Sequence, residues 1–142
     1  MSAINTGKVI VGGVVAGVVM TLVDIVVTGG LLASRWNAAM ERLGLPPFDE
    51  GGPTDLATLI GTNIILGLLL AFVYAAIRPR FGPGPKTAVV AGLLVALPPI
   101  LTVLSMSTMD VFEMSMVGTF ALSTLIVVCA GALVAGWIYK EA

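Results

Sequence analysis

Charged residues are scarce in this chain, histidine is missing, and cysteine occurs once. Charged residues make up 11% of the 142 residues, whereas a soluble domain averages about 25%, so an ordinary soluble domain is excluded. The absence of histidine excludes histidine-ligated haem, a Ser-His-Asp triad and a Cys-His pair. The single Cys129 excludes a cysteine-rich zinc site and an intramolecular disulfide. The formal net charge of -1 excludes a general nucleic-acid binder.

Apolar residues, in contrast, account for 58% of the chain and form long runs. A membrane helix needs about 20 mostly apolar residues to cross a hydrocarbon core about 30 Å thick. Runs of that length cover about residues 9–33, 56–77, 87–109 and 114–139. The sequence therefore predicts an all-α, polytopic membrane protein. We expect one domain over residues 1–142, with four transmembrane helices in an up-down bundle.

The distribution of Lys and Arg predicts the orientation, because these residues concentrate on the cytoplasmic side of a membrane. One side of the predicted bundle carries Lys8, Arg78, Arg80, Lys86 and Lys140. The other side carries only Arg35 and Arg42. Both termini should therefore be cytoplasmic, with the first span retained as a signal anchor rather than cleaved as a signal peptide.

The outer loop, residues 34–55, contains a segment that favours a short helix. Trp36, Met40 and Leu43 recur at positions i, i+4 and i+7, and two prolines follow them. This short helix could continue the first span or lie along the membrane surface. Thr54 is a candidate N-cap for the second span.

Small residues predict where the helices pack, because helices in lipid associate through close contact and hydrogen bonds rather than through hydrophobic burial. The expected packing positions are Gly13, Gly17, Gly67, Gly131 and Ala135. A GxxxG spacing serves equally well inside a bundle and between two copies of a chain. We favour packing within the chain over homodimerisation.

Two consecutive prolines, Pro98 and Pro99, stand near the middle of the third span. They remove two backbone donors, so we expect them to kink or open the helix there. The hydroxyls of Thr102 and Ser105 could bind local backbone groups or a neighbouring helix. Such a kink often only shapes a bundle, and a gate or binding site is the alternative.

Asp24 is the only ionisable residue deep in any predicted span. A charged carboxylate at the membrane centre costs at least about 2.5–3.5 kcal/mol on insertion scales, so Asp24 should face the bundle, be partnered or be protonated. Depth along each helix predicts a shared polar layer of Asp24, Asn63, Thr102, Ser123 and Thr124. The layer could be an interhelical hydrogen-bond cluster, a proton or cation relay (or polar-solute site), or a contact with a partner subunit.

Four methionines gather near the outer end of the last two spans: Met106, Met109, Met114 and Met116. Thioether ligands select Cu(I), but methionine is also an adaptable filler at helix ends. Without histidine or a second cysteine to support copper, we predict no metal site and no cofactor.

Residues 74–88, YAAIRPRFGPGPKTA, follow a pattern that resembles an uncharacterised family of small bacterial four-span integral membrane proteins. The opening Asn5-Thr6-Gly7-Lys8-Val9 and the spacing Trp36-x-x-Ala39-Met40 belong to the same resemblance. The resemblance implies a location in the bacterial inner (cytoplasmic) membrane. It carries over no catalytic residues.

The expected function is that of a non-enzymatic integral membrane protein. It would act as an accessory or structural subunit of a larger membrane complex, or as a homo-oligomer. Its partners would be the lipid bilayer and another protein or a second copy, and no nucleic acid. The alternative is a small channel or transporter with a polar path through Asp24 and Asn63. An enzyme acting on lipid ranks third, because no nucleophile–base pair can be named.

Overall fold

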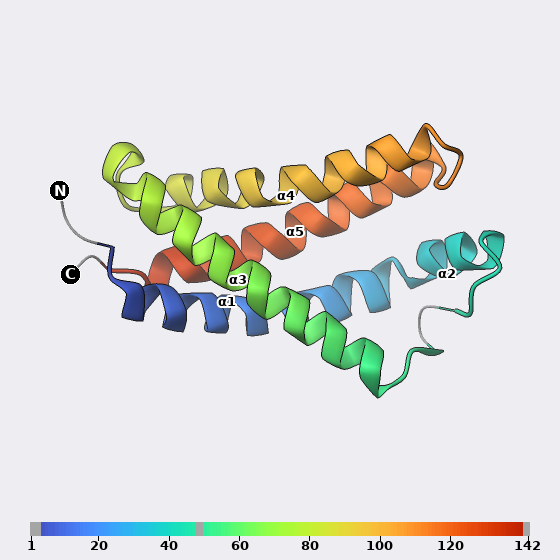
Figure 1. The fold of residues 1–142 in the computed structure, drawn as a ribbon, viewed down its shortest axis with the longest axis horizontal. Helices are drawn as coiled ribbons and strands as arrows, with labels where there is room; N and C mark the ends of the chain where they lie inside the picture. The colour runs from blue at the N-terminus through green and yellow to red at the C-terminus, as the bar shows by residue number, and fades with distance from the viewer. Residues whose placement is uncertain (1–3, 48–49, 141–142) are drawn as a thin grey trace.

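A computed structural model describes residues 4–47 and 50–140 of the chain. Every regular element in these ranges is a helix (Figure 1). The elements are α1 (Thr6–Val26), the π-helix η1 (Val27–Leu31), α2 (Ala33–Arg42), α3 (Pro53–Phe81), α4 (Pro85–Ser107) and α5 (Met114–Ile138). The prediction of an all-α bundle is confirmed.

Four helical segments are long and apolar enough to cross a membrane: Thr6–Leu31, Pro53–Phe81, Pro85–Ser107 and Met114–Ile138. They pack against one another, so the chain has the architecture of a multi-pass membrane protein. The first segment combines α1 with η1, which the sequence did not predict. The predicted boundaries of the other three lie within four residues of the observed ones.

Helix α3 begins earlier than its predicted span, at Pro53. Its N-cap is Gly52 rather than Thr54, and the Asp55 carboxylate accepts a hydrogen bond from the Gly52 amide at 2.8 Å. The expectation of a Thr54 cap is therefore wrong: proline suits the first helical position because it has no amide hydrogen to satisfy there. At 29 residues, α3 is about 43 Å long, and it lies diagonally across the other helices (Figure 1).

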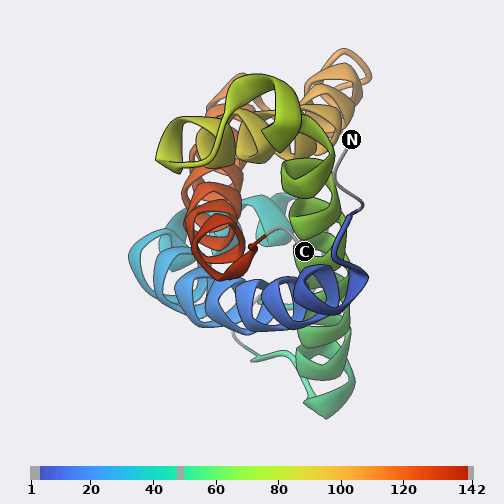
Figure 2. The same ribbon diagram turned by 90° about the vertical axis from the view of Figure 1, so that its left-hand side faces the viewer.

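The helices run alternately up and down. Both ends of the described chain and the α3–α4 connection lie at one end of the bundle, and α2 and the α4–α5 connection lie at the other (Figures 1 and 2). We call these the inner end and the outer end, after the predicted orientation. The arrangement follows from short connections between successive antiparallel helices.

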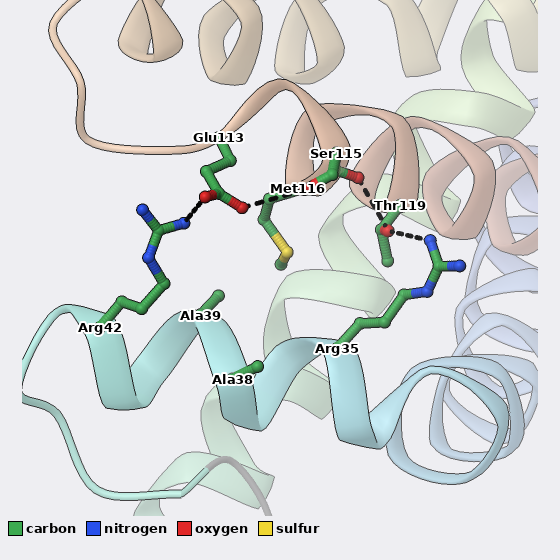
Figure 3. Close-up of a pocket in the computed structure, with 8 residues that line it drawn as sticks. All are labelled: Arg35, Ala38, Ala39, Arg42, Glu113, Ser115, Met116 and Thr119. Carbon is green, nitrogen blue, oxygen red and sulfur yellow. Dashed lines mark hydrogen bonds and ion pairs between the residues drawn. The ribbon is translucent and has the colours of Figure 1, made fainter.

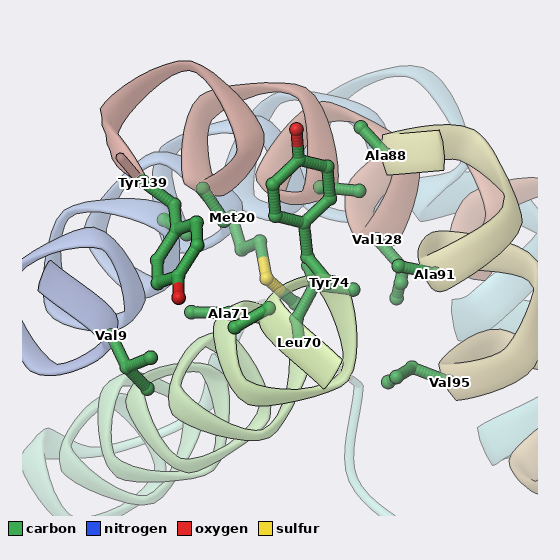
Figure 4. Close-up of a cluster of buried hydrophobic side chains, with 14 of the residues drawn as sticks. Val9, Met20, Leu70, Ala71, Tyr74, Ala88, Ala91, Val95, Val128 and Tyr139 are labelled. Atoms are coloured by element: carbon green, nitrogen blue, oxygen red, sulfur yellow. The ribbon is translucent and has the colours of Figure 1, made fainter. Parts of the chain in front are cut away.

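Aromatic residues join the segments that meet at the inner end. The Tyr139 hydroxyl accepts a hydrogen bond from the Asn5 amide at 3.3 Å, and the Tyr74 hydroxyl accepts one from the Gly84 amide at 3.2 Å. The two rings meet edge to face, with centroids 6.0 Å apart (Figure 4). The Arg78 guanidinium carbon lies 5.6 Å from the centre of the Tyr139 ring. These contacts hold the start of α1, the end of α5 and the α3–α4 connection together.

Glycines set the closest helix crossing, between α1 and α3. A Cβ atom added at Gly13 would lie 2.6 Å from the Leu68 Cα, and one at Gly17 would lie 2.6 Å from the Ile64 Cα. On the facing helix, a Cβ at Gly67 would collide with the Gly13 carbonyl oxygen. The two backbones therefore touch directly, which only residues without a side chain permit.

Helix α5 packs against α1 and α4 through small residues as well. A Cβ at Gly131 would lie 2.5 Å from the Met20 sulfur, and Ala135 is fully buried. The core is consequently made mostly of alanine and valine around Met20, Leu70 and Tyr74 (Figure 4).

Helix α4 continues as one helix through Pro98 and Pro99. The expectation that the prolines open the helix is not met, and no separate segments form there. The prolines lack an amide hydrogen and cannot donate to the carbonyls of Leu94 and Val95. The Thr102 hydroxyl does not replace these missing bonds, because it donates to the Pro98 carbonyl at 3.0 Å.

Candidate functional site

Asp24 forms a polar cluster with Thr28 and Asn63, which we call the Asp24 cluster. The Thr28 hydroxyl donates to Asp24 Oδ1 at 2.6 Å, and Asn63 Nδ2 donates to Asp24 Oδ2 at 3.5 Å. Thr28 and Asn63 are buried, and Asp24 is half-buried. Both carboxylate oxygens of Asp24 therefore have a donor, one from its own helical segment and one from α3.

The glycine crossing positions Asn63 beside α1. A Cβ atom at Gly17 would lie 2.7 Å from the Asn63 carbonyl oxygen, so the two backbones are in contact about two helical turns from Asp24, toward the inner end. This close approach lets a short asparagine side chain reach a carboxylate on the facing helix.

The other members of the predicted polar layer do not join the Asp24 cluster through hydrogen bonds of their own. Ser123 is buried, and its hydroxyl donates to the Phe120 carbonyl at 3.0 Å. Thr124 is half-buried on α5. Thr102 is exposed and bonds the backbone of its own helix. The structure thus joins Asp24 and Asn63 by a hydrogen bond, whereas the hydrogen bonds of Thr102 and Ser123 go to the backbone of their own helices.

The Asp24 cluster stands where α1 changes into a π-helix. In η1 the hydrogen bonds skip one more residue than in an α-helix, and the Leu32 amide donates to the Val27 carbonyl at 2.9 Å. A single-turn π-helix is rare and is often found at functional sites. The only sequence signal for it is the pair Gly29-Gly30, where an added Cβ would meet nothing within 4 Å.

The outer end holds a second candidate site, between α2 and the beginning of α5 (Figure 3). We call it the outer groove, and its volume is about 290 Å³. It is lined by Arg35, Ala38, Ala39 and Arg42 from α2, and by Glu113, Ser115, Met116 and Thr119 from α5 and the residue before it.

Polar and aromatic contacts attach α2 to α5 at this groove. Arg35 Nη1 donates to the Thr119 hydroxyl at 3.3 Å, and Arg42 forms an ion pair with Glu113 (Figure 3). Beside the groove, the Trp36 and Phe120 rings meet edge to face at 6.2 Å. The short helix therefore neither continues α1 without a break nor stands alone. This site was not predicted from the sequence, although Arg35 and Arg42 lie seven residues apart and so share one helix face.

The four methionines near the outer end differ in their surroundings. Met116 is buried and lines the outer groove, whereas Met109 and Met114 are 75% and 66% exposed. Among the residues that the structure describes, no group of three or more His, Cys, Asp and Glu side chains could hold a metal ion.

One face of α4 is buried in its inner half and exposed in its outer half. Ala91, Val95, Pro98, Thr102 and Ser105 follow one another at spacings of four and three residues, which places them on the same face. Ala91 and Val95 are buried and point toward α3 (Figure 4). Pro98, Thr102 and Ser105 are exposed. We call these three residues the open face of α4.

The open face exists because α3 diverges from α4 toward the outer end (Figure 1). The first ten residues of α3, from Pro53 to Thr62, are exposed except for the half-buried Leu59. Beyond Val95, no helix in the described part of the chain covers that side of α4.

The chain was compared with known proteins at three levels. No protein-family model, no curated protein and no solved structure matches it.

Proposed function

We propose that the chain is a non-enzymatic integral membrane protein that serves as an accessory subunit of a larger membrane complex. It binds a transmembrane helix of another subunit on the open face of α4. Its proposed location is the bacterial inner membrane, which the resemblance of residues 74–88 implies, with both termini in the cytoplasm. That orientation is supported by the five Lys and Arg residues assigned to the inner end.

The open face of α4 is the observation that carries this proposal. It consists of a proline and two hydroxyl residues in the outer half of an apolar membrane helix. Small and hydroxyl-bearing residues are typical of helix–helix interfaces in membranes, whereas lipid-facing positions favour large apolar side chains. The other side of α4 carries large apolar side chains of the kind that face lipid: Leu97, Leu101 and Leu104 are exposed there.

The hydroxyls of the open face are already bonded within α4. Thr102 donates to the Pro98 carbonyl, and Ser105 donates to the Thr102 carbonyl at 2.8 Å. Because these hydroxyls already have hydrogen-bond partners, the open face can be exposed to lipid before the partner binds. When the partner binds, the hydroxyls can exchange these local hydrogen bonds for interhelical ones.

The proposal is tested by native mass spectrometry of the tagged protein, gently extracted from its own host. The variants are Thr102→Trp, which fills the open face, and Leu104→Trp, which places the same ring on the lipid-facing side. We expect a stoichiometric heteromeric partner with the wild type and with Leu104→Trp, and loss of that partner with Thr102→Trp. Recovery of a homo-oligomer alone would replace the accessory subunit by a self-assembling one. A monomer alone would contradict both.

The second candidate function is a small channel or transporter with a polar path through Asp24 and Asn63. The position of the Asp24 cluster beside the π-helix η1 favours it. The exposure of Thr102 gives it less support, because this hydroxyl bonds the backbone of its own helix and adds no polar group beside Asp24. Proton flux into proteoliposomes that carry wild-type protein or Asp24→Asn tests this function. Flux that falls with the substitution would favour the channel, and equal flux would leave the Asp24 cluster a structural one.

A further inference from the structure

We propose that the outer groove binds a phosphate group, held between the guanidinium groups of Arg35 and Arg42. The phosphate is either the headgroup of an anionic phospholipid in the outer leaflet or a free phosphate ion. This site is separate from the open face of α4. The inference does not depend on the accessory-subunit role, but its assignment to the outer leaflet rests on the proposed orientation.

The placement of basic residues is the first argument. The chain has seven Lys and Arg residues, and only Arg35 and Arg42 belong to the outer end. Basic residues are disfavoured on that side of a membrane protein, and yet both of them line the same groove. Arginine matches phosphate geometry because its planar guanidinium group donates two parallel hydrogen bonds.

The shape of the groove is the second argument. Arg35 and Arg42 are two helical turns apart on α2, about 10 Å along the helix axis. Ala38 and Ala39 lie between them and leave the floor of the groove open (Figure 3). The volume of about 290 Å³ accommodates a phosphate together with the first atoms of its ester group.

The current partner of Arg42 is the third argument. Glu113 is the N-cap residue of α5, but its side chain makes no capping hydrogen bond. One carboxylate oxygen pairs with Arg42, and the other accepts a hydrogen bond from the Ser115 hydroxyl at 3.2 Å. Both side chains of this ion pair are more than half exposed, at 60% and 57%. An exposed ion pair contributes little because water and salt screen it. Glu113 therefore occupies the groove as an internal anion that a phosphate can displace.

The second arginine, Arg35, is oriented by hydrogen bonds within the protein. Arg35 donates through one nitrogen to Thr119, whose hydroxyl is buried and donates in turn to the Ser115 carbonyl at 3.0 Å. Arg35 has four further N–H donors, and its side chain lines the groove beside Thr119 (Figure 3). The two guanidinium groups point toward opposite ends of the groove (Figure 3). A phosphate beside the oriented Arg35 would thus be reached by the flexible Arg42 side chain once that side chain is released from Glu113 and turns inward.

The site lies at a depth where phosphate is abundant. The outer groove is formed by the first turns of the membrane helix α5, and α2 follows the first membrane-spanning segment directly. These elements bring the groove to the interface between hydrocarbon and water, where the phosphates of the outer leaflet lie.

The test is a titration of the purified, detergent-solubilised full chain, followed by the fluorescence of Trp36 beside the groove. Trp137 is first replaced by phenylalanine in every variant, so that Trp36 is the only tryptophan. The probes are short-chain phosphatidylglycerol, short-chain phosphatidylcholine and inorganic phosphate. The variants are Arg35→Gln, Arg42→Gln and Glu113→Gln, with Arg80→Gln at the inner end as the matched control.

We expect saturable binding of phosphatidylglycerol or inorganic phosphate, weakened at least about tenfold by Arg35→Gln and by Arg42→Gln. Glu113→Gln should tighten binding several-fold, because the competing internal anion is removed, and Arg80→Gln should leave it unchanged. Tighter binding of phosphatidylglycerol than of inorganic phosphate assigns the site to lipid, and the reverse assigns it to free phosphate.

The proposal is overturned if neither anion binds saturably, or if the Arg42→Gln and Arg80→Gln variants lose affinity equally. Binding of phosphatidylcholine as tight as that of phosphatidylglycerol also overturns it, because the fluorescence would then report detergent exchange. Arg42 has an exposed side chain and makes only an exposed ion pair, so Arg42→Gln keeps the test valid even if Arg35→Gln does not fold.

Discussion

At the scale of single residues, glycines determine how closely α1 and α3 pack. Gly13, Gly17 and Gly67 each face the backbone of the opposite helix, and none of them has room for a methyl group. Gly61 lies on α3 as well, but an added Cβ there would meet nothing within 4 Å. The two α3 glycines therefore provide a matched pair.

We expect Gly67→Ala to lower the free energy of unfolding by about 1–3 kcal/mol, the usual cost of overpacking a tight interface. Gly61→Ala should be neutral or stabilising by up to about 1 kcal/mol, because alanine favours the helix over glycine. Unfolding in mixed detergent micelles, followed by circular dichroism, measures both values. Equal effects of the two substitutions would contradict the close crossing.

At the scale of elements, α1 is joined to α2 by the π-helix η1 and the non-helical residue Leu32, and together they set the rotation of α2. Hydrogen bonds in a π-helix enclose one more residue than those in an α-helix, and one extra residue rotates the side chains that follow by about 100° around the axis. In the observed setting Arg35 reaches Thr119 and Trp36 reaches Phe120. The outer groove depends on this setting.

Deletion of Gly30 should convert η1 into regular α-helix and rotate α2 away from α5. In a Trp137→Phe background, we expect the deletion to make Trp36 more accessible to an aqueous quencher such as iodide. Gly30→Ala is the control, because it keeps the residue count and its added Cβ meets nothing within 4 Å. Unchanged quenching in the deletion variant would show that η1 does not position α2.

At the scale of the whole molecule, the described chain ends and the α3–α4 connection share one end of the bundle, opposite α2 (Figure 1). Pro83 lies in the α3–α4 connection, and Pro46 lies in the segment between α2 and α3. Both are exposed. A label that cannot cross the membrane should therefore distinguish the two positions.

We expect a membrane-impermeant maleimide to label Pro46→Cys in intact cells and Pro83→Cys only after the membrane is opened, both in a Cys129→Ala background. The physical reason is the excess of Lys and Arg at the inner end. The opposite pattern would reverse the proposed orientation and leave the bundle intact. Labelling of both positions in intact cells would contradict the up-down arrangement itself.

Run length and charge placement in the sequence were sufficient to predict four membrane helices in an up-down bundle. Apolar length is a local property, because each span must cross the hydrocarbon core whatever its neighbours do. The glycine positions expected at helix contacts could also be named from the residues, since close approach in lipid depends on small side chains. Depth along the helices placed Asp24 and Asn63 in one predicted polar layer, together with three hydroxyl residues of α4 and α5.

The tertiary structure decided which of the polar residues meet. Position along a helix gives depth in the membrane, and by depth Thr102 belongs with Asp24. Whether two side chains touch also depends on the rotation and tilt of each helix, and these follow from contacts between residues far apart in the chain. The glycine crossing tilts α3 onto α1 and away from the outer half of α4, so Asn63 reaches Asp24 while Thr102 remains exposed. The connection through η1 and Leu32 likewise brings Arg35 and Arg42 to α5, a juxtaposition that the spacing of residues along the chain could not reveal.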